Sequence, residues 1–211
     1  MRALLDDLQV NVGCVPKKVM WNAAFVKDVV EHADEYGHNI DMSTYSFDWD
    51  RLKTSRDGYV TRLNGIYAGN LDNSGVTLLR GHARFDGESG KVVVETDDGS
   101  STSLTADHVL ITTGGAPLIP GDVPGAQEHG IDSDGFFDIA ALPKKVAVVG
   151  AGYIAVELAG VLNVLGSETE LFVRKEGVLR GFDADVAAFL NKELVHDGAE
   201  NALLLASHFH I

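Results

Sequence analysis

The segment from residue 144 to residue 175 constrains the fold most strongly. It reads KKVAVVGAGYIAVELAGVLNVLGSETELFVRK. A β-branched run leads into a glycine turn, an apolar helical pattern and a second β-rich run, all within about thirty residues. This order predicts a βαβ unit with two parallel strands, and therefore an α/β protein.

The glycine turn of this unit has the GxGxxA pattern that is typical of dinucleotide-binding folds. Gly150 permits the tight turn, Gly152 lets the backbone approach a pyrophosphate, and Ala155 is small enough for the helix to pack on the sheet. The pyrophosphate would lie at the helix N-terminus, where free N–H groups favour anions. The alternative is a helix–sheet turn that binds nothing.

The end of the second strand distinguishes between the two nicotinamide dinucleotides. NAD-binding folds place an acidic residue there, whereas this chain has Arg174, followed by Arg180. Guanidinium groups can pair with a 2′-phosphate that an acid would repel. The sequence therefore favours NADPH over NADH, unless both arginines are only solvated surface residues.

Upstream of residue 144, the sequence predicts helices followed by strands. One helix begins after VNVGCVP and ends near Gly37, and a second covers 47–71 with Asp48 as its N-cap. The ranges 75–85 and 91–115 are β-rich, and Asp98-Gly99 inside the second range is a hairpin turn signal. Prolines and glycines in 116–130 indicate a linker.

Downstream of the βαβ unit, one more helix is predicted over 183–195, and the final residues 200–211 fit no clear element. His208 and His210 in this tail have H-x-H spacing but no further ligands, so we expect no metal site.

Composition excludes several classes of protein. The 211 residues are 45% hydrophobic, which indicates a folded chain, and the net charge of −14 argues against nucleic-acid binding. One cysteine excludes an internal disulfide. The start of the chain has acids where a signal peptide needs an apolar core, and no apolar run is long enough for a membrane span, so a cytoplasmic location is expected.

The single cysteine lies at a predicted helix start. Cys14 is followed by Pro16, Lys17 and Lys18. The helix dipole and the nearby ammonium groups would stabilise a thiolate, which makes Cys14 a candidate reactive thiol. An inert buried cysteine is the alternative.

Around this cysteine, VNVGCVPKKVMW resembles the redox helix of the FAD-dependent pyridine-nucleotide disulfide oxidoreductases, and within them the glutathione reductases. Further matching motifs follow in order: RDGYVTRLNGIYAGNL, RGHARF, ADHVLITTGG, GIDSDGFF and VAVVGAGYIAVELAG. The resemblance covers residues 10 to about 195. It implies a Rossmann-like flavoprotein fold with two dinucleotide-binding domains, both incomplete here.

The domains implied by the resemblance are 1–115, a partial FAD-binding domain lacking its N-terminal βαβ unit, and 116–211, a partial NADPH-binding domain. The family's C-terminal dimer-interface domain is expected to be absent. The implied activity carries electrons from NADPH through FAD to glutathione disulfide, in a homodimer.

The resemblance also implies residue roles. Catalytic roles fall to Cys14, Lys17, Glu157 and Tyr153. Lys17 pairs with Glu157 near the flavin, and Tyr153 gates the nicotinamide site. Cofactor contacts are implied for Lys17, Ala83, Thr113, Gly114, Gly150, Ala151, Gly152, Ile154, Ala155, Glu157, Arg174 and Arg180, and glutathione disulfide contacts for Tyr59, Tyr67 and Asn70.

The sequence departs from the family pattern at one decisive position. Gln9 stands where the family has the first cysteine of its redox pair. A single thiol can form a mixed disulfide with glutathione but cannot cycle. We therefore expect little activity from this chain alone, and two alternatives stay open: a non-catalytic NADPH-binding remnant or a gene fragment that does not fold.

Overall fold

The computed structural model describes residues 8–87, 90–173, 177–194 and 204–207 of the chain. Arg174, His208 and His210 lie outside these ranges. The chain forms two compact units, one made of residues 1–16 and 57–118 and the other of 17–56 and 119–211. Residues 17–56 thus group with the C-terminal half, and we describe each unit by itself.

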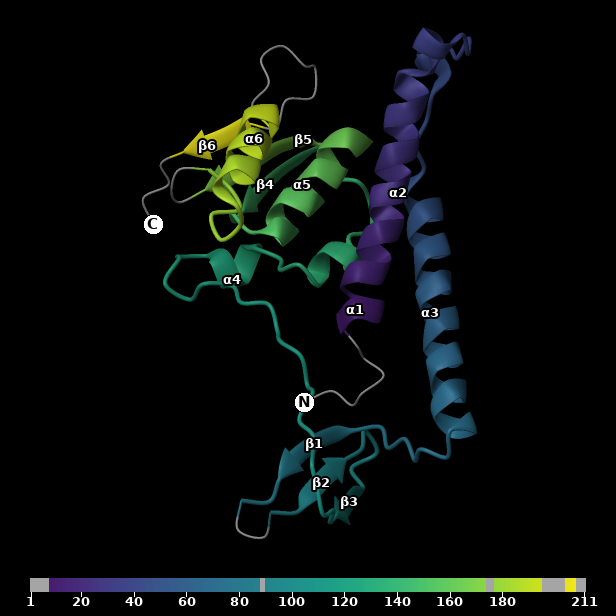
Figure 1. The fold of residues 1–211 in the computed structure, drawn as a ribbon, viewed down its shortest axis with the longest axis vertical. Helices are drawn as coiled ribbons and strands as arrows, with labels where there is room; N and C mark the ends of the chain where they lie inside the picture. The colour runs from purple at the N-terminus through teal and green to yellow at the C-terminus, as the bar shows by residue number, and fades with distance from the viewer. Residues whose placement is uncertain (1–7, 88–89, 174–176, 195–203, 208–211) are drawn as a thin grey trace. The chain divides into compact units, whose positions relative to one another are not determined.

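The second unit contains the predicted βαβ arrangement (Figure 1). Strand β4 (Lys145–Val149) leads through helix α5 (Tyr153–Leu165) to strand β5 (Glu168–Val173). The two strands pair in parallel, from Lys145 opposite Glu168 to Val149 opposite Phe172. The predicted order of strand, helix and strand, with the two strands parallel, is confirmed.

The same sheet has a third parallel strand that the sequence did not indicate. Helix α6 (Ala184–Leu194) is confirmed where it was predicted, and strand β6 (Leu204–Ser207) then pairs with β5. The expectation of no element in 200–211 is wrong at these four residues. The pairing depends on the free edge of β5, which lies more than thirty residues away along the chain.

The core of the second unit lies between the sheet and its helices. Ala159 of α5 and Leu171 of β5 are completely buried, and Val173 and Val178 are nearly so. Leu190 and Leu194 of α6 pack against this cluster. The apolar face of α5 therefore covers one face of the sheet, as its periodicity predicts.

Two long helices precede the sheets. After the short helix α1 (Leu8–Asn11), helix α2 runs over Cys14–Glu31 and continues as the 3-10 helix η1 (Ala33–Tyr36). Gly37 then ends it in the left-handed conformation, with φ of 83°, as expected for a helix that stops at glycine.

Helix α3 (Trp49–Asn73) starts where the sequence placed it. It is preceded by the 3-10 helix η2 (Met42–Thr44). The backbone N–H of Arg51 donates a 2.9 Å hydrogen bond to Oδ1 of Asp48, so the predicted N-cap is confirmed.

The first unit contains an antiparallel sheet of strands β1 (His82–Phe85), β2 (Val92–Glu95) and β3 (Ser101–Leu104). β2 and β3 form the predicted hairpin, with Gly99 at φ of 82° in its loop. The strand expected within 107–115 is absent from the described structure. Leu110 is 85% exposed, and no described strand lies beside this segment to pair with it.

The predicted linker contains the short helix α4 (Ala126–His129), and the 3-10 helix η3 (Gly135–Asp138) follows it. Phe136 and Phe137 of η3 are buried in the second unit. Trp49 donates a hydrogen bond from its indole N–H to the carbonyl of Ile139, at 2.9 Å, which fastens the start of α3 to this segment.

Candidate functional site

The glycine turn joins β4 to α5 in a conformation that suits glycine alone. Gly150 has φ of 157°, and its N–H donates to the carbonyl of Phe172 on β5, at 3.0 Å. A Cβ atom at Gly150 would lie 3.0 Å from Cβ of Ala155. The turn is therefore tight because both residues are small, as their spacing predicts.

Gly152 has a different role because open space surrounds it. Gly152 is the N-cap of α5, and because glycine has no side chain it makes no side-chain capping hydrogen bond. A Cβ atom at this position would meet no atom within 4 Å. The first turn of α5 also has no acidic residue. The helix N-terminus thus keeps free N–H groups and an unopposed positive dipole end, a suitable place for an anionic group.

The residues that flank Gly152 differ in their surroundings: those after it are exposed to solvent, and the one before it makes a backbone hydrogen bond. Tyr153 and Ile154, at the start of α5, are 55% and 43% exposed. Ala151 accepts a 2.8 Å hydrogen bond through its carbonyl from the N–H of Leu179. The glycine turn is therefore followed by two exposed side chains at the start of α5, and a hydrogen bond joins it to the segment that follows β5.

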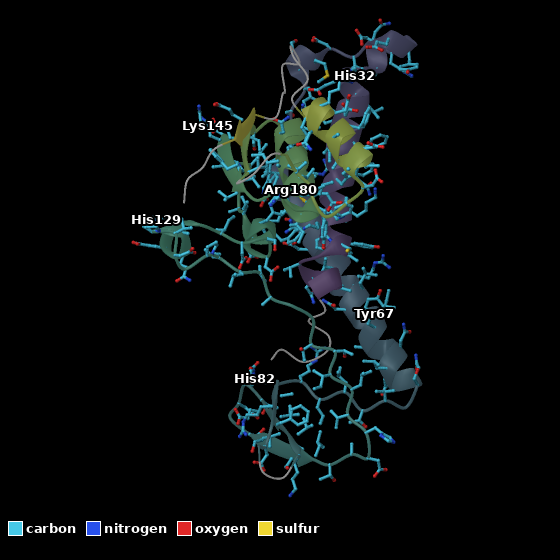
Figure 2. All side chains as sticks on the ribbon, turned by 60° about the vertical axis from the view of Figure 1, so that its left-hand side comes forward. His32, Tyr67, His82, His129, Lys145 and Arg180 are labelled. Atoms are coloured by element: carbon cyan, nitrogen blue, oxygen red, sulfur yellow. The ribbon has the colours of Figure 1, made fainter. Side chains whose placement is uncertain are left out.

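Arg180 belongs to this following segment and is exposed in the same unit as the glycine turn (Figure 2). It lies one residue after Leu179, whose carbonyl accepts from the N–H of Phe182 at 2.9 Å. Its predicted partner Arg174 lies outside the described residues. The structure thus leaves one accessible guanidinium on a turn that is bonded to the glycine loop.

Lys17 and Glu157 form an ion pair across 140 residues of sequence. Nζ of Lys17 lies 2.9 Å from Oε1 and 2.9 Å from Oε2 of Glu157. The side chains are 25% and 38% exposed, so water partly screens the pair. The pair joins α2 to α5.

Cys14 begins helix α2 and belongs to the first unit. Its thiol is free and exposed. The burial assumed in the alternative of an inert cysteine is therefore contradicted, whereas the reactivity of the thiol stays a prediction. Its exposure leaves the sulfur accessible to a disulfide from solvent.

The three residues expected to contact the substrate lie on the part of α3 that belongs to the first unit. Tyr59, Tyr67 and Asn70 are spaced by eight and three residues, which places them on one side of the helix. Tyr59 and Tyr67 are 39% and 43% exposed (Figure 2 labels Tyr67). The guanidinium of Arg62 lies 5.1 Å from the centre of the Tyr59 ring.

The remaining predicted cofactor contacts are dispersed in the first unit. Ala83 lies on β1 opposite Val94, whereas Thr113 and Gly114 lie in the segment without regular structure that follows β3. Gly114 has φ of 66°, a conformation that favours glycine. Within the described residues, these three positions therefore do not form one cavity.

Two residues that the motif analysis missed hold the helices in place. Arg56 of α3 is 2% exposed, and its Nη2 donates to the carbonyl of Phe137 at 2.6 Å. Asn64 donates from Nδ2 to Oδ1 of Asn11 at 2.8 Å, three residues before Cys14. The available signal was the position of Arg56 on α3, one helical turn after the apolar Leu52 and therefore on the same side of the helix.

Metal-binding clusters and membrane-spanning helices are both lacking among the described residues. No group of three or more His, Cys, Asp or Glu side chains there is arranged to hold a metal ion. Among the same residues, no helix combines the length and the hydrophobicity of a membrane span.

Comparison with known proteins gives concordant matches. Residues 3–203 match the family model described as pyridine nucleotide-disulphide oxidoreductase. The chain is 47% identical to a glutathione reductase of Schizosaccharomyces pombe over 190 residues, and 49% identical to one of Yarrowia lipolytica over 195 residues. Each alignment covers 90% of this chain, but the chain spans only about two-fifths of either relative, 40% and 41%.

Proposed function

Because this chain belongs to the pyridine nucleotide-disulphide oxidoreductase family, we propose that it is a glutathione-disulfide reductase-type oxidoreductase that takes its electrons from NADPH. The full route in this family runs from NADPH through FAD to the disulfide. On its own, this chain has little turnover because it has only one cysteine. Its proposed location is the cytoplasm, where it serves glutathione redox homeostasis.

The observation that carries the proposal is the glycine turn at the start of α5. The open space at Gly152 and the uncapped helix N-terminus suit a pyrophosphate, and Arg180 provides a positive charge for the 2′-phosphate. Gly150, Ala151, Ile154, Ala155 and Arg174 complete the proposed NADPH contacts, and Tyr153 covers the nicotinamide. When bound, NADPH supplies a hydride.

FAD enters the proposal through the family alone. Gly150 and Gly152 are the only glycines with GxG spacing in the 211 residues, so the sequence offers one pyrophosphate turn, and NADPH takes it. Lys17, held by Glu157, and Ala83, Thr113 and Gly114 are the proposed flavin contacts.

The proposed substrate surface is the side of α3 that carries Tyr59, Tyr67 and Asn70. The thiolate of Cys14 attacks one sulfur of glutathione disulfide, an S–S bond forms between Cys14 and one glutathione, and the other glutathione leaves as a thiolate. A second protein thiol would be needed to resolve this mixed disulfide. Cys14 is the only cysteine in the 211 residues, so the reaction stops there.

We assign residues 1–115 to FAD binding and 116–211 to NADPH binding, in a homodimer. An exposed apolar face on α2 supports the dimer. Trp21, Phe25 and Val29 lie at i, i+4 and i+8 and are 41%, 51% and 50% exposed. Lys18 at one end of this face and Asp28 near the other would pair if two copies met in antiparallel orientation.

The decisive experiment titrates the purified chain with NADPH and NADH and then adds glutathione disulfide. We expect preference for NADPH, and no oxidation of NADPH at 340 nm above the rate without protein. The Schizosaccharomyces pombe glutathione reductase is the positive control for the assay. Sustained turnover by the chain would contradict the limit set by its single cysteine, and absence of NADPH binding would contradict the dinucleotide site.

Two alternatives are distinguished by further measurements on the same chain. A non-catalytic NADPH-binding remnant would bind NADPH, and its Cys14 would not form a mixed disulfide with glutathione detectable by mass spectrometry. A gene fragment that does not fold would lack a cooperative thermal transition. The exposed side chain of Cys14 favours the reactive thiol over the first alternative.

A further inference from the structure

The segment 177–182 between β5 and α6 is held in place by contacts with α6, with the core cluster and with the glycine turn. Gly177 and Leu179 both have left-handed backbone conformations, with φ of 68° and 56°. Leu179 is the one described non-glycine residue with positive φ. A leucine in this conformation is strained, so the surrounding contacts must impose it.

Asn191 of α6 supplies the first of these contacts. Its Oδ1 accepts a hydrogen bond from the backbone N–H of Val178 at 2.9 Å, and its Nδ2 donates to the carbonyl of Ala187 at 2.6 Å. The amide packs directly on Gly177, since a Cβ there would lie 2.7 Å from both Oδ1 and Nδ2. Asn191 therefore fixes the start of the segment against α6.

Two further contacts fix the rest of the segment. The Val178 side chain is 1% exposed within the core cluster, and the N–H of Leu179 donates to Ala151 of the glycine turn at 2.8 Å. Phe182 then closes a turn onto the carbonyl of Leu179. Arg180 lies inside this turn, so its backbone position is set by Asn191 on one side and by the glycine turn on the other.

We propose that Asn191 is a positioning residue for dinucleotide specificity: by anchoring Val178, it holds Arg180 where a 2′-phosphate on a dinucleotide bound at the glycine turn would lie. This inference rests on the proposed NADPH site and adds a residue to it. Asn191 touches no part of the ligand, because its amide is engaged with Val178 and Ala187. It acts on selectivity between phosphorylated and unphosphorylated adenosine groups.

The test measures dissociation constants of the full chain for 2′,5′-ADP and 5′-AMP by isothermal titration calorimetry. Asn191→Ala should weaken 2′,5′-ADP binding by about tenfold, the scale of one charge-assisted contact, and change 5′-AMP binding less than about twofold. Asn191→Asp keeps an acceptor for the Val178 N–H and should restore most of the selectivity. Arg180→Gln is the reference for complete loss of the guanidinium.

The double variant Asn191→Ala with Arg180→Gln separates positioning from general damage. If Asn191 acts through Arg180, the double variant should bind both ligands as Arg180→Gln alone does, because the two effects are not additive. Equal weakening of both ligands by Asn191→Ala, or additive effects in the double variant, would overturn the proposal.

Gly177→Ala reaches the same contact from the other side and provides an independent variant if Asn191→Ala does not fold. Its Cβ would displace the Asn191 amide, so we expect the same selective loss for 2′,5′-ADP; retention of full selectivity in this variant would count against the proposal. A wild-type chain that binds both ligands equally would overturn the NADPH preference as well, whereas a selective wild type with insensitive variants refutes only the role of Asn191.

Discussion

Gly150 and Gly152 are two residues apart, yet a methyl group at each would meet different surroundings. At Gly150 it would be pressed against Ala155 in a conformation with φ of 157°, whereas at Gly152 it would enter open space. The first glycine is therefore required by the fold. The second is required only if something occupies the space in front of the helix.

This difference gives a paired prediction. Gly150→Ala should lower the free energy of unfolding by about 1–3 kcal/mol, because alanine is strained at this φ. Gly152→Ala should leave that free energy within about 0.5 kcal/mol but weaken 2′,5′-ADP binding, because its Cβ enters the proposed pyrophosphate space. Urea denaturation and calorimetry measure the two quantities. Undiminished binding by Gly152→Ala would show that no ligand approaches this backbone.

The ion pair between Lys17 and Glu157 is expected to contribute little to stability. Both side chains reach solvent, and exposed pairs contribute about 0.2–1 kcal/mol. A double-mutant cycle with Lys17→Met and Glu157→Gln should give a coupling energy in this range that decreases in high salt. A coupling above about 2 kcal/mol would indicate a desolvated pair and a structural function for both residues.

At the scale of elements, the β2–β3 hairpin depends on one carboxylate. Asp98 accepts hydrogen bonds from the Thr96 hydroxyl and from the backbone N–H of Ser100. The Thr96 hydroxyl contributes most, and together with the amide and the hydroxyl of Ser100 it lowers the pKa of Asp98 from 3.8 to about 2. Because the folded pKa is depressed, the stabilisation is present above pH 3.8 and is lost as the pH falls through 2.

We therefore expect the chemical shift of the Ser100 amide, measured by NMR, to titrate with a midpoint near pH 2. Asp98→Asn should abolish this titration, and the neighbouring Asp97→Asn should leave it unchanged as the matched control. A midpoint near 3.8 would mean that the loop does not hold its hydrogen bonds in solution.

Elements defined by local signals were predictable, and those defined by pairing were not. The N-cap Asp48 and the turn at Gly99 lie next to the elements that they fix, so the sequence indicated α3 and the hairpin. The β-rich run at 107–113 had every local feature of a strand, but a strand also requires a neighbour. Strand β6 shows the converse, since an unremarkable segment becomes a strand beside β5.

At the scale of the whole chain, buried apolar residues are concentrated in the second unit. Leu158, Val161, Leu165 and Leu171 are among them, whereas in the β1–β3 sheet only Val94 is buried. Local stability follows the density of buried contacts. Hydrogen exchange should therefore be slowest in α5 and β5 and faster in β1 to β3, as measured by mass spectrometry of the native chain.

The proposed dimer is testable at the same scale. Phe25→Glu places a charge in the middle of the exposed α2 face and should shift the chain from dimer to monomer in analytical ultracentrifugation. Tyr36→Glu, at an exposed position of η1 beyond that face, is the control. A wild-type chain that is monomeric at every concentration tested would contradict the dimer.

The sequence by itself determined the βαβ unit, the glycine turn within it and the starts of its helices, because each depends on residues within a turn or two of one another. Motif resemblance added the pairing of Lys17 with Glu157 as an expectation. Only the tertiary structure decided that Arg56 is buried beneath Phe137, that Asn191 anchors Val178, and that Leu179 adopts a strained backbone. These features depend on partners distant in sequence, and the free energy of burial or of a hydrogen bond exists only once those partners meet.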